Sequence, residues 1–186
     1  MNDLVLITGV SSGVGLSLAR HLAERFRVIG VARQLELAAE RLADVPNVTL
    51  HRADLRYPEQ VDSVLAEIEA QHGHPSRVVN NAGVNLPAKL EELDLENMQA
   101  SLAVNCLAPL LVMKRLLPRM AADGFGRVIN VTSGAPLNCF PGYASYSASK
   151  GALNAVSLTA ANEYRDANVK VNLMSPGPVR SNMAPT

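Results

Sequence analysis

A tyrosine and a lysine lie four residues apart, at Tyr146 and Lys150, where the sequence pattern predicts the start of a helix. That spacing places both side chains on one helix face. A free phenol has a pKa of about 10, and a neighbouring ammonium group favours the phenolate, which moves the pKa toward the working range of an acid–base catalyst. Ser133 precedes Tyr146 by thirteen residues, and its hydroxyl could hydrogen-bond a substrate oxygen beside the phenol. The three residues predict a proton-transfer site.

A glycine-rich segment, Thr8 to Gly15, follows an apolar run and precedes a helical pattern. Glycines there permit a tight turn and a close backbone approach to a pyrophosphate, and a helix N-terminus supplies free N–H groups for the anion. Between a strand and a helix, such a string is typical of dinucleotide binding. The residues that we expect at the cofactor phosphates are Gly9, Ser11, Ser12, Gly13, Val14 and Gly15.

The end of the second apolar run indicates which nicotinamide cofactor fits. An NAD site uses an acid there to hold the ribose 2′-OH, whereas an NADP site uses a base for the 2′-phosphate. This chain reads Val31-Ala32-Arg33, with no acid before Glu36. The guanidinium of Arg33 can fork onto a phosphate, and the serines of the glycine-rich segment could also reach it. The sequence favours NADP(H), with NAD(H) as the alternative.

Short β-branched apolar runs alternate along the chain with longer helical patterns. This alternation predicts one α/β domain, residues 1–186, with a doubly wound parallel sheet of the Rossmann type between two helical layers and the strand order 3-2-1-4-5-6. Ligands of such a sheet lie beyond the carboxyl ends of the strands. The expected strands cover 4–7, 28–31, 48–50, 77–80, 127–132 and 169–174, and the expected helices cover 14–25, 35–43, a stretch opening at 58, 94–122 and 144–166.

Composition argues against several kinds of partner. Seventeen Lys and Arg balance seventeen Asp and Glu, so the formal net charge is zero, and we expect neither nucleic acid nor an anionic membrane as a partner. No run approaches the roughly 18 apolar residues of a membrane span, and the N-terminal apolar run is too short for a signal peptide. Cys106 and Cys139 lack metal-type spacing. Reduced thiols and a cytoplasmic protein are the expectation.

The histidines predict no metal site. His72 and His74 lie in a loop without a nearby carboxylate or thiolate in the sequence, and we interpret them as solvated. The loop before the predicted helix at 144 borders the expected substrate region. Three of its residues are open candidates for substrate contact, namely Asn138, Phe140 and Tyr143.

Together, these motifs resemble those of the short-chain dehydrogenase/reductase family, over essentially all 186 residues. The glycine spacing, TGxxxGxG, is that of the single-domain dehydrogenase branch, and the joint occurrence of the motifs in this order is highly specific. The motifs are Thr8 to Gly15, Asp54-Leu55, Asn80-Asn81-Ala82-Gly83, Asn105, Ser133, Tyr146 with Lys150, and Pro176-Gly177.

The resemblance implies an NADP(H)-dependent oxidoreductase that interconverts a carbonyl and an alcohol on a small molecule. Tyr146 would be the general acid in reduction and the base in the reverse direction, and Ser133 would orient the carbonyl. Lys150 would lower the tyrosine pKa and hydrogen-bond the nicotinamide ribose. Asn105 would hold a water that links Lys150 to solvent. The implied cofactor contacts are Asp54, Leu55, Asn81, Ala82, Gly83, Tyr146, Lys150, Pro176, Gly177, Val179 and Ser181.

Pro109 gives a separate reason to expect something unusual at Asn105. It lies four residues later inside the predicted helix 94–122, and proline has no N–H to donate to the carbonyl of residue 105. That carbonyl is therefore free for a water, and the helix is expected to kink there. The alternative is a tolerated kink without chemistry.

The sequence stops at Thr186, whereas chains of the family continue through a helical substrate lid, another helix and a seventh strand. These C-terminal elements are lacking here, and the sequence leaves open whether the chain is truncated or naturally short. The predicted helices 94–122 and 144–166 remain for an interface, so we expect a homodimer, with a tetramer possible. Two other functions stay open: a cofactor-binding protein with little or no catalysis, such as a redox sensor or a subunit, and a structural scaffold without nicotinamide affinity.

Overall fold

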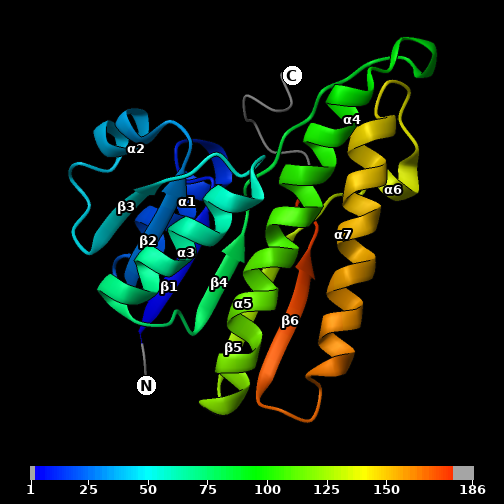
Figure 1. Cartoon of the computed structure of the whole chain (residues 1–186). Helices are drawn as coiled ribbons and strands as arrows, with labels where there is room; N and C mark the ends of the chain where they lie inside the picture. The colour runs from blue at the N-terminus through cyan, green and yellow to red at the C-terminus, as the bar shows by residue number, and fades with distance from the viewer. Residues whose placement is uncertain (1–2, 178–186) are drawn as a thin grey trace.

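The computed structural model describes residues 3–177, which contain a six-stranded sheet in the order β3-β2-β1-β4-β5-β6 (Figure 1). Every neighbouring pair of strands is parallel. The predicted fold class and strand order are confirmed. The strands are β1 Leu4–Thr8, β2 Arg27–Ala32, β3 Val48–Arg52, β4 Arg77–Asn80, β5 Gly126–Val131 and β6 Val169–Met174.

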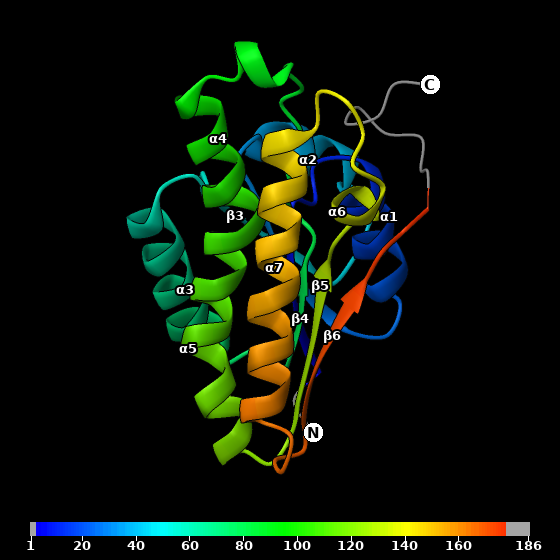
Figure 2. The same cartoon turned by 90° about the vertical axis from the view of Figure 1, so that its right-hand side faces the viewer.

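Helices cover both faces of the sheet. Figure 2 shows α3, α5 and α7 on one side and α1 on the other. Two short elements have no counterpart in the sequence-based prediction, the 3-10 helix Leu90–Glu92 and the single helical turn α6. The helices are α1 Gly13–Leu22, α2 Leu35–Arg41, α3 Pro58–His72, α4 Leu95–Leu102, α5 Ala108–Ala122, α6 Ala135–Asn138 and α7 Ala144–Glu163.

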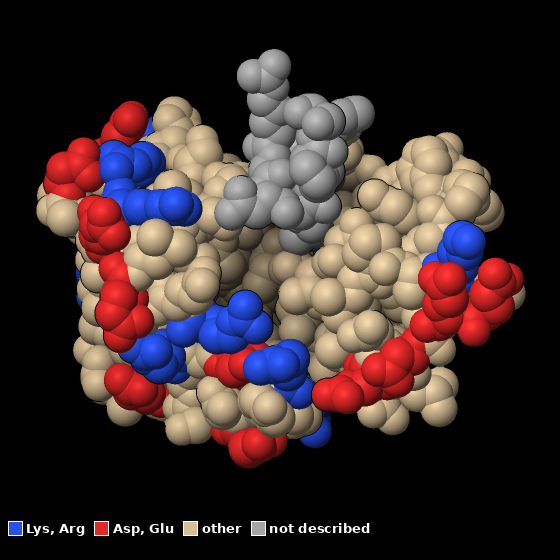
Figure 3. Space-filling view, turned by 90° about the horizontal axis from the view of Figure 1, so that it is seen from above, with Lys and Arg blue, Asp and Glu red and all other residues tan. Residues whose placement is uncertain are grey.

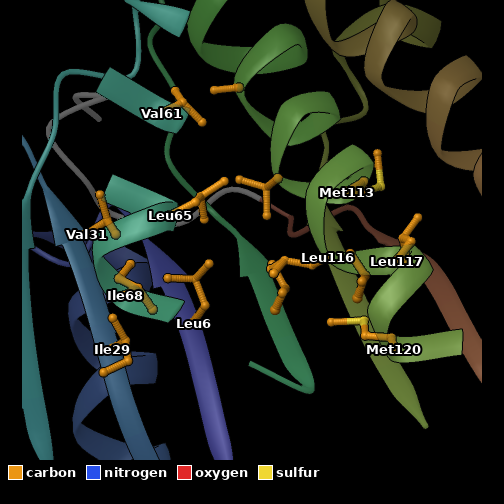
Figure 4. Close-up of a cluster of buried hydrophobic side chains, with 14 of the residues drawn as sticks. Leu6, Ile29, Val31, Val61, Leu65, Ile68, Met113, Leu116, Leu117 and Met120 are labelled. Carbon is orange, nitrogen blue, oxygen red and sulfur yellow. The ribbon is translucent and has the colours of Figure 1, made fainter. Parts of the chain in front are cut away.

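Two hydrophobic clusters fix the sheet between the helical layers. Because successive side chains of a strand point to opposite faces, Leu4 and Leu6 of β1 join the cluster with α3 and α5, whereas Val5 and Ile7 join the cluster with α1 and α2. Burial on both faces explains why the strands read as continuous apolar runs. Figure 4 shows one cluster, in which strand residues meet α3 and α5 through Leu6, Ile29, Val31, Val61, Leu65, Ile68, Met113, Leu116, Leu117 and Met120.

The predicted helix 94–122 is interrupted around Asn105. A π-helical turn, Ala103–Leu107, separates α4 from α5, and the Ala108 amide donates to the Ala103 carbonyl five residues earlier. Pro109 cannot donate to the carbonyl of Asn105, so the ordinary α-helical bond is impossible there. The predicted position of the irregularity is confirmed, and its form is a widened turn of the kind often found at functional sites.

The same helical stretch, Leu95–Ala122, is long and apolar enough to cross a membrane by length and composition alone. More than half of its most apolar window is buried inside the fold. Its buried side chains, among them Val112, Leu116 and Met120, pack in the cluster shared with α3 and the sheet. The apolar character of this helix therefore has an explanation in core packing.

Two glycines are expected to respond in opposite ways to alanine. A Cβ at Gly15, in α1, would overlap the Gly9 carbonyl oxygen and the Asn81 side-chain amide, whereas a Cβ at Gly151, in α7, would lie 3.9 Å from its nearest neighbour, Pro136 Cβ. Gly15→Ala is expected to lower the free energy of unfolding by about 1–3 kcal/mol through overpacking. Gly151→Ala is expected to raise it by up to about 1 kcal/mol, because glycine is a poor helix former. Urea denaturation followed by circular dichroism checks both signs, and a stabilising Gly15→Ala would contradict this account of the contact between α1 and the loop after β4.

Candidate active site

A cavity of about 830 Å³ lies at the carboxyl ends of the strands and is lined by loops that follow all six of them. Figure 3 looks down on this end of the molecule. Of the predicted site residues, Gly15 and Asn105 do not line the cavity, and Val179 and Ser181 lie outside the described residues. Those that line it are Gly9, Ser11, Ser12, Gly13, Val14, Arg33, Asp54, Leu55, Asn81, Ala82, Gly83, Ser133, Tyr146, Lys150, Pro176 and Gly177.

The N-terminus of α1 opens into this cavity. Gly9 and Gly13 have φ of 77° and 56°, a left-handed backbone that glycine adopts without steric cost. The Gly9 amide donates to the Val31 carbonyl at 2.8 Å, which ties the loop to β2. The first turn of α1 has no acidic residue. Its first amides lack helical partners and carry the positive end of the helix dipole, so the loop can hold an anion.

The loop after β4 is fastened to the glycine-rich loop. Thr8 Oγ1 accepts hydrogen bonds from the amides of Asn81 and Ala82, at 3.1 and 3.0 Å. Asn81 Nδ2 donates in return to the carbonyls of Thr8 and Gly9, at 3.0 and 3.2 Å. Gly15 packs against the same groups. Gly15 therefore lies behind the cavity wall, and its lack of a Cβ lets α1 pack closely against the loop after β4.

Charged residues gather where β2 and β3 end. The Arg56 guanidinium donates to both carboxylate oxygens of Asp54, with the shortest contact at 2.6 Å. That hydrogen bond, and the nearby charge of Arg33, hold the pKa of Asp54 below its usual range. Arg33 is exposed and donates no hydrogen bond within residues 3–177, so its fork of N–H groups is available to a ligand. Sequence reasoning missed Arg56, although its place two residues after Asp54 permits such a local pair.

Tyr146 and Lys150 lie in the first two turns of α7, and Ser133 follows β5. Lys150 is buried, its Nζ lies 5.9 Å from the Tyr146 ring centroid, and it donates to the Val131 carbonyl at 2.7 Å. Burial lowers the pKa of Lys150 to about 8. Burial raises the pKa of Tyr146, and a hydrogen bond with Ser133 opposes that rise. The direction for Tyr146 is opposite to the expected one, because desolvation of the phenol outweighs the other effects.

Asn105 is completely buried and joins the loop after β4 to α7. Its Oδ1 accepts from the Val84 amide at 2.8 Å, and its Nδ2 donates to the Val84 carbonyl and to Ser149 Oγ, both at 2.9 Å. Ser149 Oγ in turn donates to the Tyr146 carbonyl at 2.8 Å. The side chain therefore positions the turn that carries Tyr146, and the role of its backbone carbonyl toward a water stays a prediction.

The three loop residues left open as substrate contacts, Asn138, Phe140 and Tyr143, all line the cavity beside Tyr146. Their place between a strand end and the following helix was the signal available in the sequence.

Two parts of the interpretation of the histidines are wrong, because His72 is the last residue of α3 and His74 has a carboxylate neighbour, although the His74 side chain is 41% exposed as expected for a solvated residue. His74 Nδ1 lies 2.9 Å from Glu69 Oε1, and His51 Nε2 lies 3.3 Å from His72 Nε2. The glutamates come from the preceding turns of α3, where Glu67 also contacts His51 Nδ1 at 3.2 Å. Residues 3–177 contain no group of His, Cys, Asp and Glu side chains that could hold a metal ion.

The pair of His51 and His72 predicts a pH-dependent stability. Burial, followed by the charges of His51 and Arg27, lowers the pKa of His72. The unfolded chain therefore binds more protons than the folded chain below about pH 6.5, and stability is lost as the pH falls through that value. Urea denaturation from about pH 8 to about pH 5.5 should show a smaller loss for His72→Gln than for the wild type. His21→Gln is the control, because His21 is exposed on α1. Equal losses in the wild type and His72→Gln would contradict the prediction.

Comparisons with known proteins agree with this geometry. A family model described as short chain dehydrogenase matches residues 3–186. A D-beta-hydroxybutyrate dehydrogenase of Rhizobium meliloti (strain 1021) is 30% identical over 184 residues, which are 95% of this chain and 71% of that protein. A 3-oxoacyl-[acyl-carrier-protein] reductase of Bos taurus is 32% identical over 185 residues, 98% of this chain and 78% of that protein.

Solved structures agree as well. The crystal structure of a metagenomic short-chain oxidoreductase in complex with NADP has a TM-score of 0.87 to this chain at 34% identity, and the match covers 97% of this chain and 85% of that one. The family match extends over nearly the whole sequence, and the sheet order and the cavity are in place. The chain belongs to the short-chain dehydrogenase/reductase family of oxidoreductases, which act on alcohol and carbonyl groups.

Proposed function

We propose that this chain is an NADP(H)-dependent oxidoreductase that interconverts a carbonyl and an alcohol, with Tyr146 as the acid–base. One observation carries the proposal: Ser133, Tyr146 and Lys150 line the same cavity as the N-terminus of α1 and the exposed Arg33. A loop suited to a phosphate and a proton donor therefore line the same cavity. A scaffold without ligands gives no reason for either.

The residues present fit a dinucleotide. The α1 amides suit its pyrophosphate, and Asp54, kept charged by Arg56, can accept a hydrogen bond from the adenine amino group. The guanidinium of Arg33 suits the 2′-phosphate of NADP. The metagenomic short-chain oxidoreductase, which is similar to this chain, was solved in complex with that cofactor. When bound, the nicotinamide supplies or accepts a hydride at the substrate carbon.

In the direction of reduction, the chain's own groups handle the oxygen and its proton. Ser133 Oγ donates a hydrogen bond to the carbonyl oxygen, and the Tyr146 hydroxyl gives that oxygen a proton as negative charge develops on it. A phenol with the ordinary pKa of about 10 is protonated at neutral pH, and burial raises the pKa of Tyr146 further, so the proton to be donated is present. The Nζ of Lys150, whose pKa burial lowers to about 8, lies 5.9 Å from the Tyr146 ring centroid, so its positive charge favours the phenolate that forms when Tyr146 gives up its proton.

Fluorescence titration of the full chain with NADPH, and separately with NADH, tests the cofactor part of the proposal. Tighter binding of NADPH is expected because Arg33 pairs with the additional phosphate. Equal or tighter binding of NADH would reject the NADP preference. Binding of neither would remove the basis of the oxidoreductase assignment and favour a scaffold.

We further propose a homodimer formed by α4, α5 and α7, which lie side by side on one flank (Figure 2). Leu107, Leu110 and Leu158 on this flank are exposed although they are large and apolar, and a second copy of the chain would cover them.

We also propose a cytoplasmic location. It is supported by the two cysteines, which are both free.

A further inference from the structure

Three aromatic rings form a row at the substrate end of the cavity. The centroids of Phe140 and Tyr143 lie 5.9 Å apart at an interplanar angle of 66°, and those of Tyr143 and Tyr146 lie 6.1 Å apart at 86°. All three residues line the cavity. The chain has only three Phe and four Tyr, and three of these seven residues, the proton donor included, form this row. Edge-to-face contacts of this kind attract aromatic rings to one another, and a ligand ring can extend the row.

The backbone holds this row in place. The Ala88 amide donates to the Gly142 carbonyl at 3.0 Å, and Ala88 forms a parallel β-bridge with Tyr143. The Tyr143 amide donates to the Phe140 carbonyl at 3.1 Å, which closes the turn between the two rings. The loop after β4 and the loop before α7 are thus joined. A ligand that enters here meets rings already positioned, so binding orders little additional chain.

The exposed charged side chains of the cavity lie away from the aromatic row, and the one charged group beside the row, Lys150, is buried. The charged side chains that line the cavity are Arg33, Asp54 and Arg56, which follow β2 and β3, and Lys150, which is buried and bonded to the Val131 carbonyl. In Figure 3, blue and red atoms lie on the left of the hollow and below it, whereas the surface immediately to its right is tan. Among the described residues that line the cavity, no exposed cation lies beside the rings, so a carboxylate placed against them would lose hydration without such a partner.

We infer that the substrate is an uncharged ketone or keto ester that carries an aryl group beside the reacting carbonyl, and that Phe140 and Tyr143 contact this aryl group. The inference rests on the proposed function, because the row of rings ends at Tyr146 as the proton donor. It separates this chain from a relative whose name specifies hydroxybutyrate, a carboxylic acid.

Four compounds, used with NADPH and the full chain, test charge and ring independently: ethyl benzoylacetate, benzoylacetate, ethyl acetoacetate and acetoacetate. Each ester is expected to have a kcat/KM roughly 100-fold above that of its acid, because the acid must bury an unpaired carboxylate. The kcat/KM for ethyl benzoylacetate is expected to exceed that for ethyl acetoacetate by about 10-fold, through the ring contacts and the additional apolar area.

Phe140→Ala separates ring recognition from the intrinsic reactivity of the two esters. In this variant the ratio of kcat/KM for ethyl benzoylacetate to kcat/KM for ethyl acetoacetate is expected to fall about 5-fold, because only the aryl ester has a ring for Phe140 to contact. Leu137→Ala is the matched control, because Leu137 lies three residues before Phe140 in α6, is 87% exposed and does not line the cavity. This variant should keep the wild-type ratio.

The outcomes distinguish the inference from the function on which it rests. Reduction of the acids as efficiently as the esters, or an unchanged ratio in Phe140→Ala, would overturn the substrate class and leave the oxidoreductase assignment standing. Absence of turnover with all four compounds while NADPH still binds would overturn the substrate class, whereas absence of NADPH and NADH binding would overturn the function itself.

Discussion

Tyr146→Phe should lower kcat/KM for carbonyl reduction by roughly 10²–10⁴-fold, the usual contribution of a positioned general acid. The substitution removes the hydroxyl and keeps the ring, so the contact with Tyr143 and the cavity wall persist. The affinity for NADPH should change little, because a lost proton donor affects the chemical step and leaves the phosphate loop intact. Steady-state kinetics with ethyl benzoylacetate, together with NADPH titration of the same variant, measure both quantities.

The matched control is Tyr164→Phe. Tyr164 follows the end of α7 and packs against the hydrophobic core, and it does not line the cavity. Loss of its hydroxyl should leave kcat/KM within about 2-fold of the wild type, as expected for a residue outside the site. Near-wild-type turnover of Tyr146→Phe would mean that another group delivers the proton. A similar loss in both variants would point to a general effect on folding.

Arg33→Ala should weaken NADPH binding by roughly 10–100-fold, which is the effect of removing a charge-assisted hydrogen-bond donor from a phosphate. NADH lacks that phosphate, so its Kd should change by less than about 3-fold. Arg33 is exposed and donates no hydrogen bond to the described chain, so its removal leaves no buried group unpaired. Fluorescence titration with each cofactor provides the comparison.

Arg25→Ala serves as the control for charge alone. Arg25 is exposed beyond the end of α1, away from the cavity, and its removal changes the net charge by the same amount. NADPH affinity should be close to that of the wild type in this variant. An equal loss of NADPH and NADH affinity in Arg33→Ala would show that Arg33 supports the loop and does not recognise the 2′-phosphate.

The fold follows from features that a sequence displays directly. Runs such as Leu4–Ile7 are apolar at every position because both faces of the strand are covered. Alternation with helical patterns then restricts the topology, and the glycine-rich segment marks the first crossover. The same parallel topology predicts from the sequence alone that the site lies in the loops at the carboxyl ends of the strands.

The remaining features depend on tertiary contacts that spacing does not encode. The pKa of Tyr146 is raised because of burial, which is set by neighbours from other elements. The ammonium of Lys150 has a hydrogen-bond partner in Val131, nineteen residues away. The row from Phe140 to Tyr146 forms only because the loop before α7 turns back on the loop after β4. Composition alone, with few aromatic residues, gave no indication of it.

The most direct test of the central claim follows a labelled hydride. The full chain is incubated with ethyl benzoylacetate and NADPH that carries deuterium at both C4 positions of the nicotinamide, and the alcohol product is analysed by mass spectrometry. Every product molecule should carry deuterium on the former carbonyl carbon, and product should form far more slowly with Tyr146→Phe. An unlabelled alcohol, or a product that forms as fast with Tyr146→Phe as with the wild type, would contradict the assignment of this chain as an NADP(H)-dependent carbonyl reductase with Tyr146 as the acid.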